Sequence, residues 1–112
     1  MSGSTYEREL KKKLQEEGWL VIRSAGSFVC DLVALNPRNH MLIEVKSNKA
    51  GNVNLGHDNK SKAQFDSLNE LAKKGFNVSY AIRWKGFKGQ KWEFHQLPLE
   101  PYPIFKIKKE VK

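Results

Sequence analysis

The amino-acid sequence predicts an α/β fold in which a mixed five-stranded sheet is flanked by helices. Two segments repeat their apolar residues with the helical period, and five short segments are rich in β-branched and aromatic residues. Their order along the chain is αβββαββ, so the second helix would connect the third strand to the fourth as a crossover. The 112 residues are enough for one core and therefore for one domain.

Both predicted helices are amphipathic. The first is expected at residues 5–17, where Tyr6, Leu10 and Leu14 recur every four residues among charged ones and a glycine follows. The second is expected at residues 62–74, again with apolar residues along one face and a glycine after the last turn.

The remaining segments are predicted as strands, turns and a tail. Residues 98–112 form a basic, Pro-containing C-terminal segment that we expect to be extended and loosely held, outside a domain of residues 1–97. The Gly- and Asn-rich stretch 48–59 is expected to be a flexible loop. The five predicted strands are residues 19–23, 28–35, 40–47, 76–84 and 91–97.

The charge balance points to a polyanionic partner. The chain has 20 Lys and Arg against 12 Asp and Glu, a formal net charge of +8. Such a domain favours nucleic acid, because each cation that neutralises a phosphate releases counterions, although a basic surface can also serve solubility alone. A single cysteine excludes an internal disulfide and a thiolate zinc site, and it suits a reducing, cytoplasmic compartment. No apolar run approaches the ~20 residues of a membrane-spanning helix.

Three charged residues interrupt two predicted strands that are otherwise apolar. Asp31 lies in one strand, and Glu44 and Lys46 lie two residues apart in the next, so both face the same side of the sheet. A structural interpretation pairs Lys46 with one carboxylate, but it leaves the other carboxylate unneutralised. In the functional interpretation, the two carboxylates offer oxygen ligands to Mg²⁺ or Mn²⁺, and the lysine assists the attacking water or the phosphate.

These residues also carry a resemblance to a known group of enzymes. Asp31, followed by a hairpin and then Glu44-Val45-Lys46, resembles the PD-(D/E)XK nuclease motif, with Cys30 in place of the usual proline. The resemblance implies a restriction-endonuclease-like αβββαβ core. More specifically, the chain resembles the archaeal Holliday junction resolvases over residues 5–97. The matching stretches are 6–10, 18–19, 23–27, 31–35, 42–47 and 92–94.

The family resemblance implies roles for particular residues. Glu7, Asp31, Glu44 and Lys46 would form the active site, and the three carboxylates would hold Mg²⁺, with Mn²⁺ as a substitute. Glu7 has a structural alternative, because its spacing from Ser4 is that of a helix capping box. The expected DNA contacts are Arg8, Arg23, Ser24, Ser27, Gln64, Lys85, Lys88 and Lys91. For the cations among these the alternative is a solvated surface, and for Gln64 it is an ordinary position in the first turn of a helix.

The predicted function is metal-dependent hydrolysis of phosphodiesters at four-way DNA junctions, during recombination and repair. Because a junction offers two symmetric strands to cut, a homodimer is expected, as in the family. One alternative is another PD-(D/E)XK nuclease, VRR-NUC-like or related to repair or restriction enzymes. A second is a DNA-binding module without catalysis, and a third is a basic RNA-associated protein, which would leave the acidic cluster unexplained.

Overall fold

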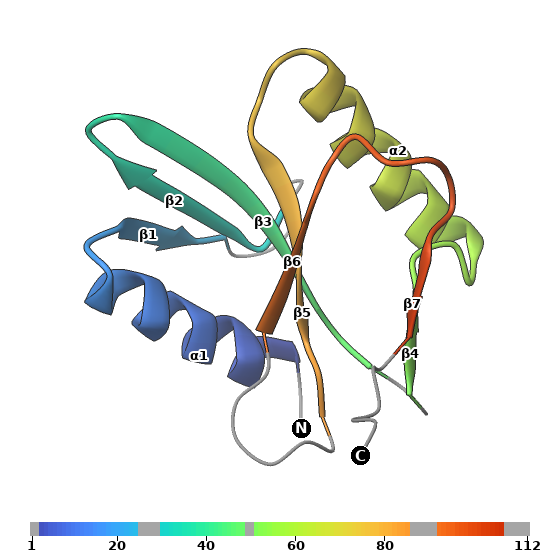
Figure 1. Ribbon diagram of the computed structural model, residues 1–112, viewed down its shortest axis with the longest axis horizontal. Coiled ribbons are helices and arrows are strands. Elements are labelled where there is room, and N and C mark those ends of the chain that lie inside the picture. The colour runs from blue at the N-terminus through green and yellow to red at the C-terminus, as the bar shows by residue number, and fades with distance from the viewer. Residues whose placement is uncertain (1–2, 25–29, 49–50, 86–91, 107–112) are drawn as a thin grey trace, which may run out of the picture.

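The computed structural model describes residues 3–24, 30–48, 51–85 and 92–106. Within them the order of elements is α1 (Gly3–Glu16), β1 (Leu20–Arg23), β2 (Leu32–Asn36), β3 (Asn39–Ser47), β4 (Asn52–Asn54), α2 (Asn59–Lys73), β5 (Val78–Arg83), β6 (Trp92–Gln96) and β7 (Ile104–Lys106), as Figure 1 shows. The main sheet has five strands in the order β1-β2-β3-β5-β6. Only β3 and β5 pair in parallel, and α2 lies between them in sequence. The predicted α/β fold with a mixed five-stranded sheet is therefore confirmed.

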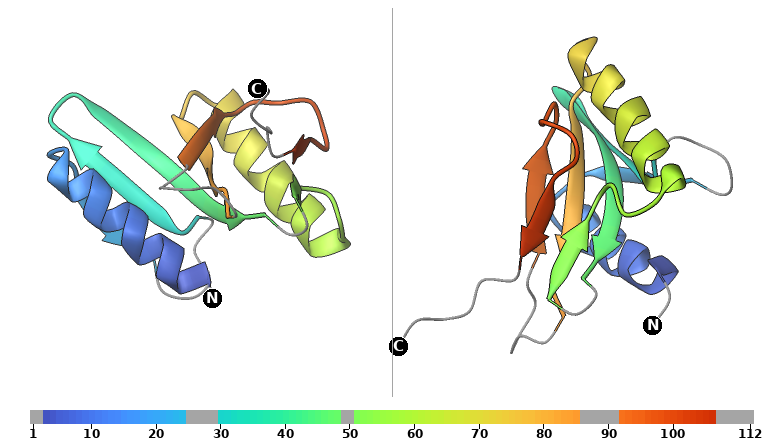
Figure 2. Two further views of the ribbon diagram at one scale, coloured as in Figure 1. Left: turned by 60° about the horizontal axis from the view of Figure 1, so that its bottom comes forward. Right: turned by 90° about the vertical axis from the view of Figure 1, so that its right-hand side faces the viewer.

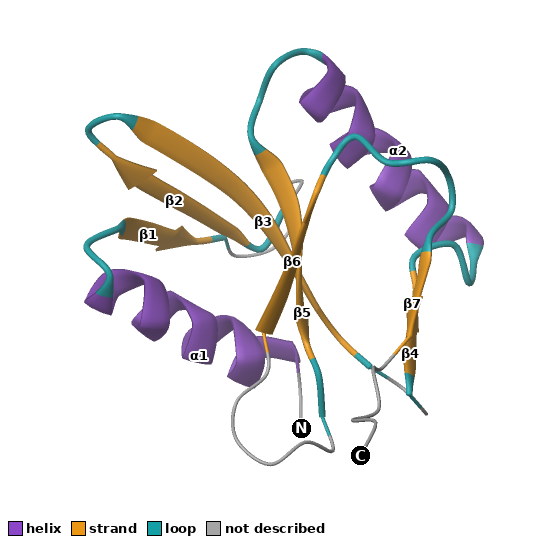
Figure 3. Ribbon diagram, in the orientation of Figure 1, coloured by secondary structure: helices purple, strands orange, loops and turns teal. Residues whose placement is uncertain are grey.

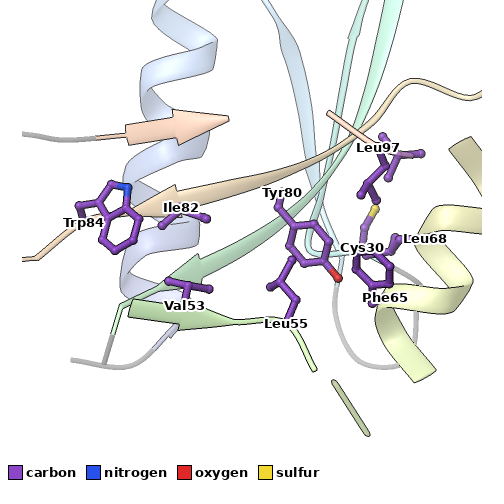
Figure 4. Close-up of a cluster of buried hydrophobic side chains, with 10 residues drawn as sticks. Cys30, Val53, Leu55, Phe65, Leu68, Tyr80, Ile82, Trp84 and Leu97 are labelled. Carbon is purple, nitrogen blue, oxygen red and sulfur yellow. The ribbon is translucent and has the colours of Figure 1, made fainter. Parts of the chain in front are cut away.

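Helix α1 and helix α2 cover opposite faces of this sheet. Because side chains alternate along a strand, Ile43 and Val45 of β3 pack with α1, whereas Leu42 packs with the core under α2. Figure 2 shows α1 along the side of the sheet formed by β1, β2 and β3, and α2 beside β5. The α2 core centres on Phe65 and Tyr80, whose rings stack (Figure 4). By this alternation Glu44 and Lys46 belong to the α2 face.

Most predicted boundaries differ from the structure by one to four residues, and two of the differences bear on the site. Strand β2 begins at Leu32, so Asp31 precedes the strand instead of lying inside it. Helix α2 begins three residues before the predicted start at 62, because the Asp58 side chain accepts a hydrogen bond from the backbone N–H of Ser61 at 2.7 Å and caps the helix. None of the helices in the described ranges is long and apolar enough to cross a membrane.

The expectations of a flexible loop at 48–59 and a loosely held tail after 97 are wrong for the described part of these segments. Strand β4 from the first pairs with β7 from the second and forms a separate two-stranded sheet (Figure 3). The buried amide of Asn69 in α2 bonds both backbone groups of Leu99, at 2.9 and 3.2 Å. The sequence pattern did not predict this pairing, because each strand is only three residues long and its partner lies far away in the sequence. The division of the chain at residue 97 stays a prediction.

Candidate active site

The candidate site forms where β2 begins beside β3. The backbone N–H of Asp31 bonds the carbonyl of Ile43 at 3.0 Å, and its carboxylate Oδ2 accepts the N–H of Val45 at 2.9 Å. The Asp31 carboxylate thus accepts the β3 hydrogen bond that one more backbone carbonyl of a longer β2 would otherwise accept. Glu44 lies between these two attachment points, so the sheet holds the two carboxylates side by side.

Glu44 is buried and electrostatically strained. Only 5% of the residue is exposed. Burial, and then the negative charge of Asp31, raise the pKa of its carboxyl to about 7, against the lowering effects of Lys46 and Gln64. A shift of this kind marks a position where a bound cation would relieve both desolvation and repulsion, since hard divalent ions prefer carboxylate oxygens.

Lys46 and Gln64 both contact the same oxygen of Glu44. The Lys46 Nζ lies 3.6 Å from Oε2, and the Gln64 amide donates to that oxygen at 2.7 Å. Gln64, predicted to contact DNA, lies in the structure against Glu44. The predicted ion pair does form, but one ammonium offsets only one of two carboxylates. The cluster is left with surplus negative charge and with Glu44 Oε1 outside both contacts.

The cluster therefore suits a hydrated divalent ion. Two carboxylates and several waters are a typical donor set for Mg²⁺. Burial raises the pKa of the neighbouring Cys30 thiol to about 11, and its sulfur donates to the Leu32 carbonyl at 3.3 Å, so this thiol stays protonated and is a poor ligand. Within the described residues, no three His, Cys, Asp or Glu side chains gather closely enough to hold one ion.

Glu7 pairs with Arg23, and sequence reasoning named both residues without linking them. The Arg23 Nε donates to Glu7 Oε1 at 3.0 Å, with 16% of the Glu7 side chain exposed. Helix α1 begins at Gly3, so Ser4 lies within it and does not occupy the cap position that a capping box requires. The expectation that Glu7 also contributes a ligand to the metal stays a prediction.

The remaining predicted DNA contacts are dispersed. Arg8 is exposed on α1, Ser24 follows β1 with its N–H bonded to the Asp31 carbonyl at 2.9 Å, and Lys85 is exposed after β5. Ser27, Lys88 and Lys91 lie outside the described residues.

Two anchoring groups were missed by sequence reasoning. Glu9 Oε2 accepts hydrogen bonds from Arg83 at 2.9 Å and from Trp92 at 2.7 Å. These bonds attach α1 to β5 and β6, and they hold the helical turn that carries Glu7. The buried Asn48 accepts the backbone N–H of Lys85 at 2.6 Å, and this bond joins the chain after β3 to the chain after β5. Both are polar contacts between residues far apart in sequence, and no local pattern signals them.

Comparison with known proteins agrees with this geometry. The family model described as archaeal Holliday junction resolvase (Hjc) matches residues 1–112. The chain is 49% identical over 45 residues to the crossover junction endodeoxyribonuclease Hjc of Methanocaldococcus jannaschii, a match that covers 40% of this chain and only 34% of that protein. The fold is similar to the 1.6 Å structure of Archaeoglobus fulgidus Hjc, a Holliday junction resolvase from an archaeal hyperthermophile. The TM-score is 0.65 at 28% identity, covering 84% of this chain and 71% of that one.

We predict that Glu44→Gln stabilises the protein in a pH-dependent way. The folded-state pKa near 7 lies above the ordinary value of 4.5, so the folded protein holds the Glu44 proton more tightly than the unfolded chain does. This favourable contribution is complete below about pH 4.5 and is lost as the pH rises through 7. The uncharged amide avoids that loss. In urea denaturation the variant should exceed the wild type by about 2–3 kcal/mol at pH 8, and the two should converge near pH 4.

The matched control is Glu16→Gln, which makes the same change on an exposed carboxylate of α1. Its free energy of unfolding should stay within about 0.5 kcal/mol of the wild type at both pH values. Equal stability of Glu44→Gln and the wild type at pH 8 would contradict the interpretation that ionised Glu44 destabilises the folded protein.

Proposed function

Because the chain belongs to the archaeal Holliday junction resolvase family, we propose that it is a divalent-metal-dependent endonuclease that resolves four-way DNA junctions in recombination and repair. The observation that carries this proposal is the joining of Asp31 to β3 at Val45, beside the buried Glu44. That arrangement places two carboxylates and one lysine at a single point of the sheet, as phosphodiester hydrolysis assisted by a metal ion requires.

The proposed cofactor is Mg²⁺, with Mn²⁺ as a substitute, held by Asp31 and Glu44 and reached by Glu7. When bound, the ion would lower the pKa of a coordinated water and neutralise charge on the reacting phosphate. Gln64 holds the Glu44 carboxylate in place through Oε2, which leaves Oε1 for the ion. For Glu7 to take part, its bond to Arg23 would have to loosen, since Oε1 is engaged there.

Lys46 is proposed to act on the phosphate. Its ammonium lies 3.6 Å from Glu44 Oε2, and 31% of its side chain is exposed, so it can reach both the cluster and a bound strand. A cation at this distance from the carboxylates would stabilise the negative charge that accumulates on the phosphate oxygens during attack. It would also favour the deprotonated form of a nearby water.

DNA would be held mainly through its backbone. A net charge of +8 supports sequence-independent phosphate contacts. We assign such contacts to the cations and polar residues that the sequence analysis named, and Gln64 would contact DNA in addition to its bond with Glu44. These residues are Arg8, Arg23, Ser24, Ser27, Gln64, Lys85, Lys88 and Lys91. A DNA-processing role also fits a cytoplasmic location, where the single cysteine stays reduced.

A homodimer would place two such sites on the two symmetric strands of a junction. The face of β1 that points away from α1 offers a surface for the second copy. Leu20 and Ile22 are 63% and 52% exposed there, beside the half-buried Val33 and Leu35 of β2. Apolar side chains exposed together in this way are typical of contact surfaces, and a two-fold dimer would bury the same patch on both copies.

A cleavage panel tests the nuclease proposal. Labelled four-way junctions, flaps and linear duplexes are incubated with Mg²⁺ or with EDTA. The wild type should nick the four-way junction symmetrically, and only with the metal.

Asp31→Asn should lower kcat on the order of 10³-fold while junction binding is retained, because the amide oxygen can still accept the Val45 N–H but cannot supply charge. Lys46→Ala should also lose cutting and keep binding.

Asp66→Asn is the matched control, since it makes the same change on an exposed residue of α2 and should cut at the wild-type rate. Preferred cutting of flaps or linear duplexes would instead favour a VRR-NUC-like, repair or restriction enzyme. Tight binding with no cutting at any metal concentration would favour a module that only binds DNA.

The dimer is tested by a matched pair of substitutions. Ile22 in β1 and Ile104 in β7 are 52% and 53% exposed, so Glu at either position should affect folding similarly. Ile22→Glu should convert the dimer to a monomer in analytical ultracentrifugation, because it places a carboxylate on both sides of the interface. Ile104→Glu should leave the dimer intact. A wild-type monomer at high concentration, or a dimeric Ile22→Glu, would refute this interface.

A further inference from the structure

A pocket of about 490 Å³ opens directly beside the candidate metal site. Lys46 and Gln64, which both contact the Glu44 carboxylate, also form part of its wall. Its volume falls in the range of small-ligand pockets, roughly 300–1,000 Å³. A strand whose phosphate reaches Lys46 would therefore bring one of its neighbouring nucleotides to the mouth of this pocket.

The pocket has an apolar floor and a polar rim, and Lys46 adds a positive charge to its wall. Val53, Leu55 and Tyr80 supply the floor and are each less than 10% exposed. The rim carries amide, hydroxyl and imidazole groups from Asn52, Asn54, His57 and Ser61. Among the described residues that line it there is no carboxylate, so nothing on its wall repels a nucleotide.

The rim is ordered by its own bonds. The Asn54 Oδ1 accepts the N–H of Gly56 at 2.9 Å, which leaves the amide hydrogens of Asn54 for another acceptor. His57 Nδ1 lies 3.0 Å from the Ser61 hydroxyl, so the loop before α2 is joined to the first turn of that helix. A flat ring resting on the apolar floor would meet these donors and acceptors around its edge, as the edge of a base requires.

The C-terminal segment holds the outer wall of the pocket in place. Strand β7 pairs with β4, and the N–H of Leu55 bonds the carbonyl of Pro103 at 3.1 Å. Tyr102 lies so close to Gly56 that a Cβ added at that glycine would come within 2.5 Å of the tyrosine Cβ. The described lining of the pocket is therefore already formed before a ligand enters.

From this geometry we infer that the pocket receives one unstacked nucleobase next to the phosphate that is cut. The inference rests on the proposed nuclease function and adds a source of selectivity to it. In a continuous duplex each base is stacked and paired, and removing one is costly. At a branch point stacking is interrupted, so a base leaves the helix more readily. The pocket would thus favour branched DNA without reading its sequence.

The test uses 2-aminopurine, whose fluorescence rises when the base leaves the stack. Four-way junctions carry this base at one of the two nucleotides beside the cut, or in a duplex arm remote from the branch. Binding is measured with Ca²⁺ in place of Mg²⁺, and cutting is measured with Mg²⁺. Wild-type protein should raise the fluorescence at one nucleotide beside the cut and leave the remote position unchanged.

A pair of variants on α2 separates filling of the pocket from general damage. Ser61→Phe places a ring in the rim, whereas Ser67→Phe places the same ring at an exposed position. Ser61→Phe should abolish the fluorescence rise and lower kcat/KM for the junction roughly tenfold, the loss expected for one stacked base. Binding of linear duplex and the unfolding temperature should stay near the wild-type values. Ser67→Phe should behave as the wild type in every measurement.

The outcomes distinguish the two proposals. If the wild type cuts junctions but the fluorescence beside the cut does not rise, or rises equally with folded Ser61→Phe, the base pocket is refuted and the nuclease stands. If the wild type cuts no DNA with any divalent metal, the proposed function fails, and the pocket proposal fails with it.

Discussion

The rest of the site depends on one hydrogen bond, from the backbone N–H of Val45 to the carboxylate of Asp31. It joins the residue before β2 to the C-terminal part of β3, one position after Glu44. The two acidic groups are then held together by a sheet that cannot move them apart without breaking its own ladder. The raised pKa of Glu44 is the thermodynamic sign of this constraint, since burial and a like charge both oppose ionisation. This local loss of stability is what a site prepared for a cation would show.

The two faces of the sheet contribute different parts to this arrangement. The α1 face is an ordinary hydrophobic core, and the contact of Glu9 with Arg83 and Trp92 holds α1 against the sheet. The α2 face supplies Gln64 against Glu44, and beside it the pocket between β3, β4 and the helix. The C-terminal segment closes this side through β7, so a part of the chain remote in sequence from the carboxylates shapes the space next to the candidate metal site.

The sequence alone was sufficient to predict features that follow a repeating pattern of residues within one segment. The alternation of Glu44 and Lys46 within an apolar strand predicted a charged cluster on one face, and the fold class followed from similar patterns. The family came from the resemblance of short motifs to those of known proteins. Sequence reasoning failed for contacts made across long separations. The pairing of Glu7 with Arg23, the three-residue strands β4 and β7, and the position of Asp31 just outside β2 depend on how segments meet in space. Periodicity within one segment contains no information about them.

In the proposed site, one divalent ion is shared by the carboxylates of Asp31 and Glu44. Anomalous diffraction from crystals soaked in Mn²⁺ measures this directly. We expect an anomalous peak within coordination distance of an oxygen from each of the two residues, about 2.0–2.3 Å. The peak should disappear in crystals of Asp31→Asn. A fully soaked crystal with no peak there, or with the two carboxylates turned away from each other, would contradict it.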